Sequence, residues 1–322
     1  MSFFNESAQM LAEMIDRSRT ISIVTHLNPD PDTIGTGLGI YHLLRTHTDK
    51  RIEIVNASES LPMHLDFLPG YGRIKRKPDF DSGLLIACDC GSAKRLGVSL
   101  EGREVVNIDH HRSNERYGDL NVILPEYASA SQVAYELFAK LYETTPQSAS
   151  CFYAALLSDT RYFTTATVDK RVFEVATALV ESGADPVEIA SHFTQRRSLA
   201  SLRVLERALH SLHLYREGKV GVMYISPDDI VATGAAMPDM EGIVDYARSL
   251  AIVRIAVLLI ENSKGDIRVS MRSKGEDVSS IASHFGGGGH TVAAGFTLQG
   301  GKMQEIVDTI LDEISKRGLI DG

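Results

Sequence analysis

Carboxylate and imidazole side chains follow three of the short apolar runs in the first half of the chain. They are His26, Asp30 and Asp32 after the run at 21–24, Asp89 after the run at 84–88, and Asp109, His110 and His111 after the run at 104–108. A set of carboxylates this large would repel itself and retain protons unless cations compensated the charge. Mixed carboxylate and imidazole ligands favour Mn²⁺ or Mg²⁺ over a metal that prefers thiolates, with zinc and iron left open. The pattern therefore predicts a two-metal site.

The apolar runs themselves are predicted to be strands of one parallel sheet. They are ISIV (21–24), IEIV (52–55), LLIAC (84–88) and EVVNI (104–108). Helical patterns alternate with these runs, which is typical of strands joined by crossover helices. Because the carboxyl ends of parallel strands meet at one edge of the sheet, the acidic and histidine residues that follow them are expected to converge there.

Beyond the fourth run, the patterns predict mainly helices and then a second, smaller α/β domain. Helices are expected at 33–46, 129–142, 147–158, 170–181 and 186–194, and over a stretch rich in Leu and Arg from Ser198 to Tyr215. After that stretch, strands are expected at 220–226, 251–260 and 266–273, with helices near 241–250 and at 302–316. We therefore predict an α/β fold with a parallel-sheet domain at 1–190, a helical linker at 191–215 and the smaller domain at 216–322.

Composition and charge exclude several classes of protein. The chain has 322 residues, of which 43% are hydrophobic and 23% charged, a balance typical of globular proteins rather than disordered or coiled-coil chains. A net charge of -9 argues against a groove for long nucleic acid, whereas a small phosphorylated ligand needs only a local cluster of donors. With three cysteines, no apolar run of membrane length and no signal-peptide pattern, a cytoplasmic location is expected.

The second domain contains a candidate phosphate site. Ser270 and Arg272 are two residues apart on a predicted strand and so face the same way, and a guanidinium binds phosphate through a two-donor fork. The glycine run beside His290 permits close backbone approach and an anion-binding nest. Each feature alone is more simply an exposed polar face or a flexible loop. Beside a two-metal site, we interpret both as contacts to the substrate's phosphate.

Two other patterns are interpreted as structural. The alternate glycines of the segment 35–39 follow a strand, with Glu53 on the next strand, but their spacing is GxGxG and an acidic loop intervenes. A dinucleotide-binding site is therefore rejected. His210 and His213 have no carboxylate pattern near them, which favours surface residues over a metal-binding pair.

Four segments together resemble the motifs of the DHH phosphoesterase superfamily. They are THLNPDPD (25–32), the single Asp89 after the third strand, the DHH triplet (109–111) and LLSDTRYF (156–163). The later segment VSMRSKGEDVSSIASHFGGGGHTVAAGF (269–296) resembles the companion DHHA1 domain, with its GGGH element at Gly287, Gly288, Gly289 and His290. The resemblance covers most of the chain.

The resemblance implies a role for each candidate residue. The implied ligands are His26 and Asp30 for a first metal ion, Asp32, His110 and Asp159 for a second, and Asp89 as a bridge between them. Asp109 is implied to orient an imidazole or a metal-bound water, and His111 to contact the phosphate or donate a proton. The substrate would be bound by Ser270, Arg272 and the GGGH element. Thr36 stands where serine or alanine often ends the first motif, a change that touches no ligand.

The compact pairing of these two domains is most similar to bacterial oligoribonucleases of the superfamily, which act on very short RNA and on 3′-phosphoadenosine 5′-phosphate (pAp). The resemblance implies a Mn²⁺-dependent phosphodiesterase that hydrolyses very short oligonucleotides, namely nanoRNA and linear dinucleotides such as pApA, with a water activated by two metal ions. It implies pAp as a further candidate substrate. A cyclic-dinucleotide phosphodiesterase, a RecJ-like exonuclease and a non-catalytic nucleotide sensor are the alternatives. The expected partners are short single-stranded RNA or dinucleotides, without long duplex nucleic acid or a membrane, and a homodimer is left open.

Overall fold

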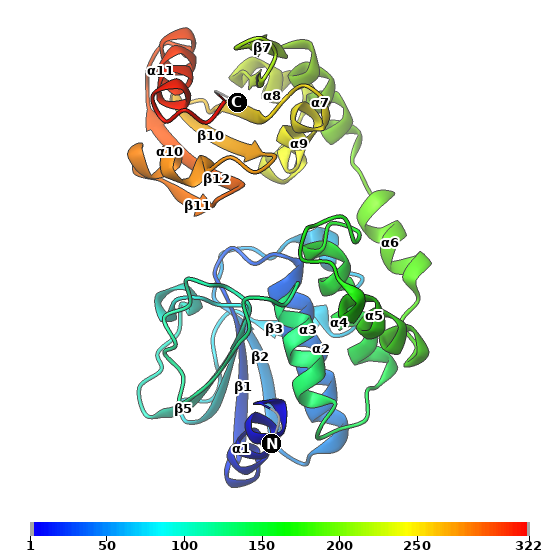
Figure 1. Ribbon diagram of the computed structural model, residues 1–322. Helices are drawn as coiled ribbons and strands as arrows, with labels where there is room; N and C mark the ends of the chain where they lie inside the picture. The colour runs from blue at the N-terminus through cyan, green and yellow to red at the C-terminus, as the bar shows by residue number, and fades with distance from the viewer. Residues whose placement is uncertain (1–2, 321–322) are drawn as a thin grey trace. The chain divides into compact units, whose positions relative to one another are not determined.

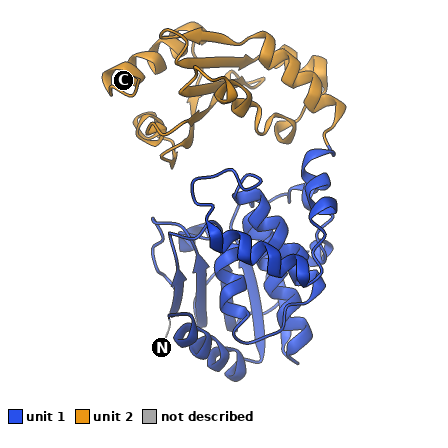
Figure 2. Ribbon diagram, turned by 45° about the vertical axis from the view of Figure 1, so that its right-hand side comes forward, with its two compact units in different colours: residues 1–196 blue, residues 197–322 orange. Residues whose placement is uncertain are grey.

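The computed structural model describes residues 3–320, which fold into two compact units (Figure 1). The first unit ends at Arg196 and the second begins at Arg197, as Figure 2 shows by colour. Each unit has its own sheet and its own hydrophobic core. The predicted α/β fold, with a parallel sheet in the first part of the chain and a second sheet after it, is confirmed.

The sheet of the first unit is parallel between all of its neighbouring strands. The strands are β1 (Thr20–Thr25), β2 (Arg51–Asn56), β3 (Ile74–Lys75), β4 (Gly83–Cys88), β5 (Arg103–Asp109) and β6 (Leu120–Ile123), in the order β3-β2-β1-β4-β5-β6. Their nearly continuous apolar sequences suit strands that are covered on both faces. The chain continues from β1 to β2 on one side and later returns to β4 on the other. The strand order therefore switches at the carboxyl ends of β1 and β4, where open α/β sheets bind ligands.

The helices that carry or adjoin site residues begin at capping side chains. The helices of the first unit are α1 (Phe3–Arg17), α2 (Pro31–His47), α3 (Ala130–Phe138), α4 (Pro146–Asp159), α5 (Lys170–Glu181) and α6 (Pro186–Thr194), with short 3₁₀ helices η1 (Met63–Leu65), η2 (Tyr71–Arg73) and η3 (Ala93–Leu96). The side chains of Asp30, Ser129 and Thr145 accept backbone N–H groups in the first turns of α2, α3 and α4. The predicted helix over 129–142 ends at Phe138, because Leu141 and Tyr142 pack on the core from a turn.

The second unit has a mixed sheet. Its strands are β7 (His213–Tyr215), β8 (Val220–Ile225), β9 (Ile255–Glu261), β10 (Asp266–Ser273), β11 (Gly288–His290) and β12 (Ala293–Gln299), in the order β11-β12-β10-β9-β8-β7. The helices are α7 (Leu199–His210), α8 (Pro227–Thr233), α9 (Ile243–Ser249), α10 (Val278–His284) and α11 (Met303–Lys316), with a 3₁₀ helix η4 (Met237–Met240). One face of the sheet packs on α10 and α11, and the β8–β9 part of the other face packs on α7 and α9.

Two local predictions for the second unit, the helix at 198–215 and the strand at 251–260, have wrong ends, and the glycine run takes a form that was not predicted. The helix expected from Ser198 to Tyr215 ends at His210, and residues 213–215 form β7 because they pair with β8. In the glycine run, residues 288–290 form β11 against β12, which neither an anion-binding nest nor the alternative of a flexible loop includes. The strand expected at 251–260 begins only at Ile255. In each case, pairing with a neighbouring strand decides the structure. None of the helices within residues 3–320 has both the length and the apolarity to cross a bilayer.

Candidate metal centre

The structure brings the predicted carboxylates and imidazoles together at the carboxyl edge of the first sheet. His26 follows β1, Asp30 and Asp32 start α2, Asp89 follows β4, Asp109 ends β5 with His110 and His111 after it, and Asp159 ends α4. These positions surround the switch in strand order at β1 and β4. The edge of the sheet that the sequence predicts is where the side chains meet.

The first group of ligand atoms lies beside β1. His26 Nε2 is 3.7 Å from Asp30 Oδ2 and 3.6 Å from Asp89 Oδ2. These separations are too long for hydrogen bonds. They lie close to the about 3.0–3.5 Å expected between neighbouring ligand atoms that each lie about 2.1 Å from one cation. The group therefore has the spacing of a ligand set.

The second group lies between β5, α2 and α4. His110 Nε2 is 3.8 Å from Asp32 Oδ2, 3.5 Å from Asp159 Oδ2 and 3.7 Å from Asp89 Oδ1. These separations are likewise close to the about 3.0–3.5 Å expected between neighbouring ligand atoms of one cation. Asp89 directs one carboxylate oxygen to each group, so the two sets share one residue.

Backbone carbonyls orient the two imidazoles. His26 Nδ1 lies 2.9 Å from the carbonyl oxygen of Leu27, and His110 Nδ1 lies 3.2 Å from that of Tyr127. Because a carbonyl can only accept, Nδ1 carries the proton of a neutral His110 ring, and its Nε2 presents the lone pair to the carboxylates. His26 Nδ1 faces both the Leu27 carbonyl and a guanidinium nitrogen of Arg95, and these two contacts hold the ring with its Nε2 toward Asp30 and Asp89. Metal-binding histidines are oriented in this way.

Asp89 supplies an observation that a cation would explain. The residue is 2% exposed, and its backbone φ of +52° lies in the left-handed region, which aspartate adopts at some cost in energy. Within residues 3–320, its Oδ1 atom accepts no hydrogen bond, because His111 Nδ1, 3.3 Å away, is hydrogen-bonded to Asp109. A buried carboxylate oxygen that accepts no hydrogen bond is costly, and a cation between the two groups would compensate for the missing bond. The residues present therefore fit a metal centre.

The pKa values in the cluster also fit a metal centre. Burial, with the nearby carboxylates of Asp89 and Asp159, raises the pKa of Asp32 well above its usual range. Burial likewise raises the pKa of Asp159 to about 6. Burial lowers the pKa of His26, but the adjacent carboxylates of Asp30 and Asp89 outweigh it and raise the pKa to about 9. Without cations the cluster thus takes up protons, which bound cations would displace.

Asp109 lies behind the cluster and holds His111. The carboxylate is fully buried, and its Oδ1 accepts from His111 Nδ1 at 2.7 Å and from the His110 backbone N–H at 2.7 Å. Its Oδ2 accepts from Asn114 Nδ2 at 2.5 Å. Burial lowers the pKa of His111, but the contacts with Asp109 and Asp89 outweigh it and raise the pKa to about 11. The ring, whose side chain is 22% exposed, is thus held in a fixed orientation at the edge of the cluster.

Two side chains at this site were not predicted. Asn114 also donates to the Cys90 carbonyl at 3.2 Å and accepts from Asn107 Nδ2 at 3.0 Å, so it ties Asp109 to the loop after β4. Arg95 places a guanidinium nitrogen 3.0 Å from His26 Nδ1. Neither residue stands in a spacing that indicates a site, because Asn114 approaches it from a loop and Arg95 from the short 3₁₀ helix η3.

The predicted structural role of the glycines at 35–39 has a physical explanation. A Cβ at Gly35 would lie 2.6 Å from the Cys151 carbonyl oxygen, and a Cβ at Gly39 would overlap the ring of Phe152. These two glycines let α2 pack closely on α4, which brings the start of α2 near the end of α4. Glu53 accepts from Ser22 Oγ at 2.7 Å and forms no part of the groups that could hold a metal among the described residues.

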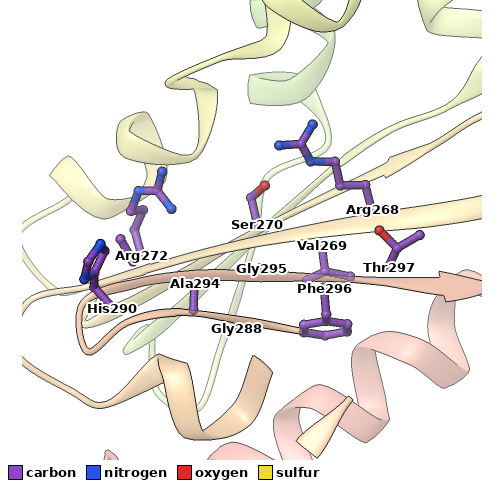
Figure 3. Close-up of a pocket in the computed structure, with 11 residues that line it drawn as sticks. Arg268, Val269, Ser270, Arg272, Gly288, His290, Ala294, Gly295, Phe296 and Thr297 are labelled. Carbon is purple, nitrogen blue, oxygen red and sulfur yellow. The ribbon is translucent and has the colours of Figure 1, made fainter. Parts of the chain in front are cut away.

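The second unit has a cavity of about 480 Å³ on its sheet (Figure 3). Four of the predicted substrate-binding residues line it, namely Ser270, Arg272, Gly288 and His290. Gly287 and Gly289 instead lie against β12, where a Cβ at either position would meet backbone atoms of that strand.

Arg268 and Thr297 also line this cavity and were not predicted. The signal for Arg268 is present in the sequence, since the two-residue alternation that puts Ser270 and Arg272 on one face includes it. His210 and His213 are both exposed, and the groups that could hold a metal within residues 3–320 do not include them.

Comparison with known families identifies both parts of the chain. Residues 20–157 match the DHH family, N-terminal domain, and residues 217–316 match the DHHA1 domain. The chain contains a DHH domain followed by a DHHA1 domain. The predicted pairing of a DHH domain with a DHHA1 domain is therefore confirmed.

Individual relatives match this DHH–DHHA1 chain over almost its whole length. It is 29% identical over 317 residues to the bifunctional oligoribonuclease and PAP phosphatase NrnA of Thermus thermophilus, covering 96% of this chain and 94% of that protein. The NrnA protein of Bacillus subtilis is 26% identical, covering 87% and 89%. The crystal structure of an exopolyphosphatase-related protein from Bacteroides fragilis superimposes with a TM-score of 0.90 at 24% identity, covering 98% and 96%. That structure shows the shared fold.

Proposed function

We propose that the chain is a phosphoesterase that uses two divalent cations, with Mn²⁺ favoured and Mg²⁺ as the second choice, to hydrolyse the phosphodiester bonds of very short oligonucleotides and a phosphate monoester of pAp. The observation that supports this most strongly is the placement of Asp89. Its two oxygens face two separate groups of ligand atoms, and one of these oxygens accepts no hydrogen bond from the described residues. The names of the relatives, oligoribonuclease and PAP phosphatase, support the choice of substrates.

The proposed metal ligands follow the two groups. His26 and Asp30 would hold one cation, Asp32, His110 and Asp159 the other, and Asp89 both. Two cations held here would stabilise the negative charge that develops on a phosphoryl group during in-line displacement. His111 Nδ1 is engaged with Asp109, so Nε2 is the ring atom that would contact the phosphate or donate a proton. Asp109 would keep the ring in that orientation.

The cavity of the DHHA1 unit is proposed to bind the substrate's phosphate or terminal nucleotide. Arg272 and His290 supply charged or polar donors, Ser270 supplies a hydroxyl, and Gly288 leaves the wall without a side chain. These donors form a small local set on a chain whose net charge is -9. We therefore expect short substrates to be preferred, since additional phosphates would meet an acidic surface. The cytoplasmic location is part of the same proposal and is supported by three buried free thiols.

The test is a panel of substrates assayed with one preparation of the full chain in Mn²⁺. The panel contains pApA, pAp, cyclic di-AMP and a 5′-labelled RNA of about 20 nucleotides. That RNA is longer than the stretch of single strand that one small binding domain contacts. We expect rapid hydrolysis of pApA and pAp and slower hydrolysis of the long RNA per chain end. Equal rates on the long RNA would indicate a RecJ-like exonuclease. Exclusive hydrolysis of the cyclic compound would indicate a cyclic-dinucleotide phosphodiesterase, and binding without turnover a sensor.

A further inference from the structure

We propose that Arg268, with Thr297, forms a second anion-binding position in the cavity of the DHHA1 unit, and that this position favours nucleotides with two phosphate groups over nucleotides with one. The inference rests on the proposed function, because it concerns how the same cavity distinguishes its substrates.

The cavity is the uncovered part of one face of the second sheet. Arg268, Ser270 and Arg272 lie two residues apart along β10, and their side chains project from the same face (Figure 3). The β9 residues paired with them are buried in the core beneath α7 and α9. On the β12 side, no helix of that core covers the face within the described residues. The β12 residues paired with Arg272, Ser270 and Arg268 have small side chains, or none. A ligand can therefore lie across β10 and β12.

Strand register divides this surface into rows. At one end, His290 on β11, Ala293 on β12 and Arg272 on β10 are paired in sequence across the sheet. At the other end, Thr297 is paired with Arg268. The middle row, where Ser270 is paired with Gly295 and Gly295 with Gly288, has almost no side-chain bulk. Each end of the cavity thus has one guanidinium and one further polar side chain, with an open floor between them.

The spacing of the two arginines suits two anionic groups better than one. Arg268 and Arg272 are four positions apart along β10, which corresponds to about 13 Å. Strand side chains stand roughly perpendicular to the sheet, and Figure 3 shows the two guanidinium groups on either side of Ser270. In that arrangement the two guanidinium groups would each bind a different anionic group of the ligand. The second phosphate of pAp, or the 5′-phosphate of pApA, is the group that Arg268 would bind.

The charge of Arg268 is available for a ligand. Other arginines of the unit are close to carboxylates, at 3.6 Å for Arg216 with Asp312 and 3.3 Å for Arg317 with Glu313. Arg268 is exposed, and within residues 3–320 no carboxylate lies within 4.0 Å of it. In an acidic chain, an exposed guanidinium without an acidic neighbour that lines a cavity is well placed to bind an anion.

The experiment measures binding rather than turnover. Full-length protein is held in EDTA, so that nothing is hydrolysed, and is titrated by calorimetry with pAp and with 5′-AMP. We expect wild type to bind pAp more tightly than AMP. We expect Arg268→Gln to weaken pAp binding by about 10- to 100-fold, the range for a charge-assisted hydrogen bond, and to leave AMP binding nearly unchanged. Arg268→Lys should retain part of the preference.

Lys264→Gln is the matched control. Lys264 is an exposed cation in the turn between β9 and β10 and does not line the cavity, so its loss changes the net charge equally and should leave the preference intact. If Arg268→Gln keeps the preference of wild type for pAp, or weakens both nucleotides equally, the second position is disproved while the proposed function stands. If wild type binds neither nucleotide, the proposed role of the whole cavity fails.

Discussion

The carboxylate of Asp89 connects two otherwise separate groups of ligand atoms, so a change at this residue should affect both. Replacing Asp89 with Asn removes the negative charge while keeping the size of the side chain. We expect calorimetric titration of EDTA-treated wild type to find two Mn²⁺ ions per chain. In Asp89→Asn we expect the affinity to fall by more than about 100-fold, beyond the loss typical of residues that merely support ligands. Asp49→Asn, an exposed site on another edge, is the control. Undiminished binding of two ions by Asp89→Asn would refute the shared-ligand assignment.

Asn114 acts on the site through Asp109. Asn114→Ala would leave the buried Oδ2 of Asp109 without its 2.5 Å donor, and an unsatisfied buried oxygen costs about 1–3 kcal/mol. We expect a lower melting temperature and a lower kcat on pApA, with Mn²⁺ affinity close to that of wild type, because Asn114 contacts none of the proposed ligands. Ser113→Ala changes an exposed neighbour and should alter neither quantity. A loss of Mn²⁺ binding in Asn114→Ala equal to that in Asp89→Asn would contradict this separation of roles.

Among the structural elements, α2 and α4 pack closely through Gly35 and Gly39, and their ends hold Asp32 and Asp159. Gly39→Ala would force a Cβ into the ring of Phe152, and overpacking of this kind costs about 1–3 kcal/mol. We expect thermal unfolding at a lower temperature and weaker Mn²⁺ binding, because the helices must move apart. Gly72→Ala is the control, since no atom lies within 4 Å of the added Cβ. A Gly39→Ala protein as stable as Gly72→Ala would show that the close approach is not required.

The elements also show which parts of the structure were predictable. The strands of the first unit were predictable because buried parallel strands are continuous apolar runs, and the acidic residues directly after them mark one edge of the sheet. β11 was not predictable, because glycine has no side chain to indicate strand pairing, and only the neighbouring β12 makes a strand of residues 288–290. Asn114 reaches the site from a loop and Arg95 from the one-turn helix η3, and neither segment is long enough to show a periodic pattern that would place its side chains. Arg268 was predictable by alternation along β10.

At the scale of the whole molecule, the two units carry different parts of the proposed activity. A fragment ending at Arg196 contains every proposed metal ligand and its own core, but lacks Arg272 and His290. We expect it to bind Mn²⁺ as the full chain does and to hydrolyse the simple diester bis-p-nitrophenyl phosphate. Its kcat/KM on pApA should fall by about 100-fold or more, because positioning of the substrate supplies much of the rate. Hydrolysis of pApA by this fragment at the rate of the full chain would show that the DHHA1 unit does not bind the substrate.

The most direct test of the account is the initial rate of pApA hydrolysis by metal-stripped full-length protein as divalent cations are restored. We expect no hydrolysis in EDTA, full activity with Mn²⁺, and much less with Ca²⁺, whose larger and looser coordination suits this compact ligand set poorly. Asp89→Asn should stay inactive at Mn²⁺ concentrations that saturate wild type. Hydrolysis of pApA by the stripped protein, or full activity of Asp89→Asn, would contradict the claim that this cluster is a metal centre for phosphodiester hydrolysis.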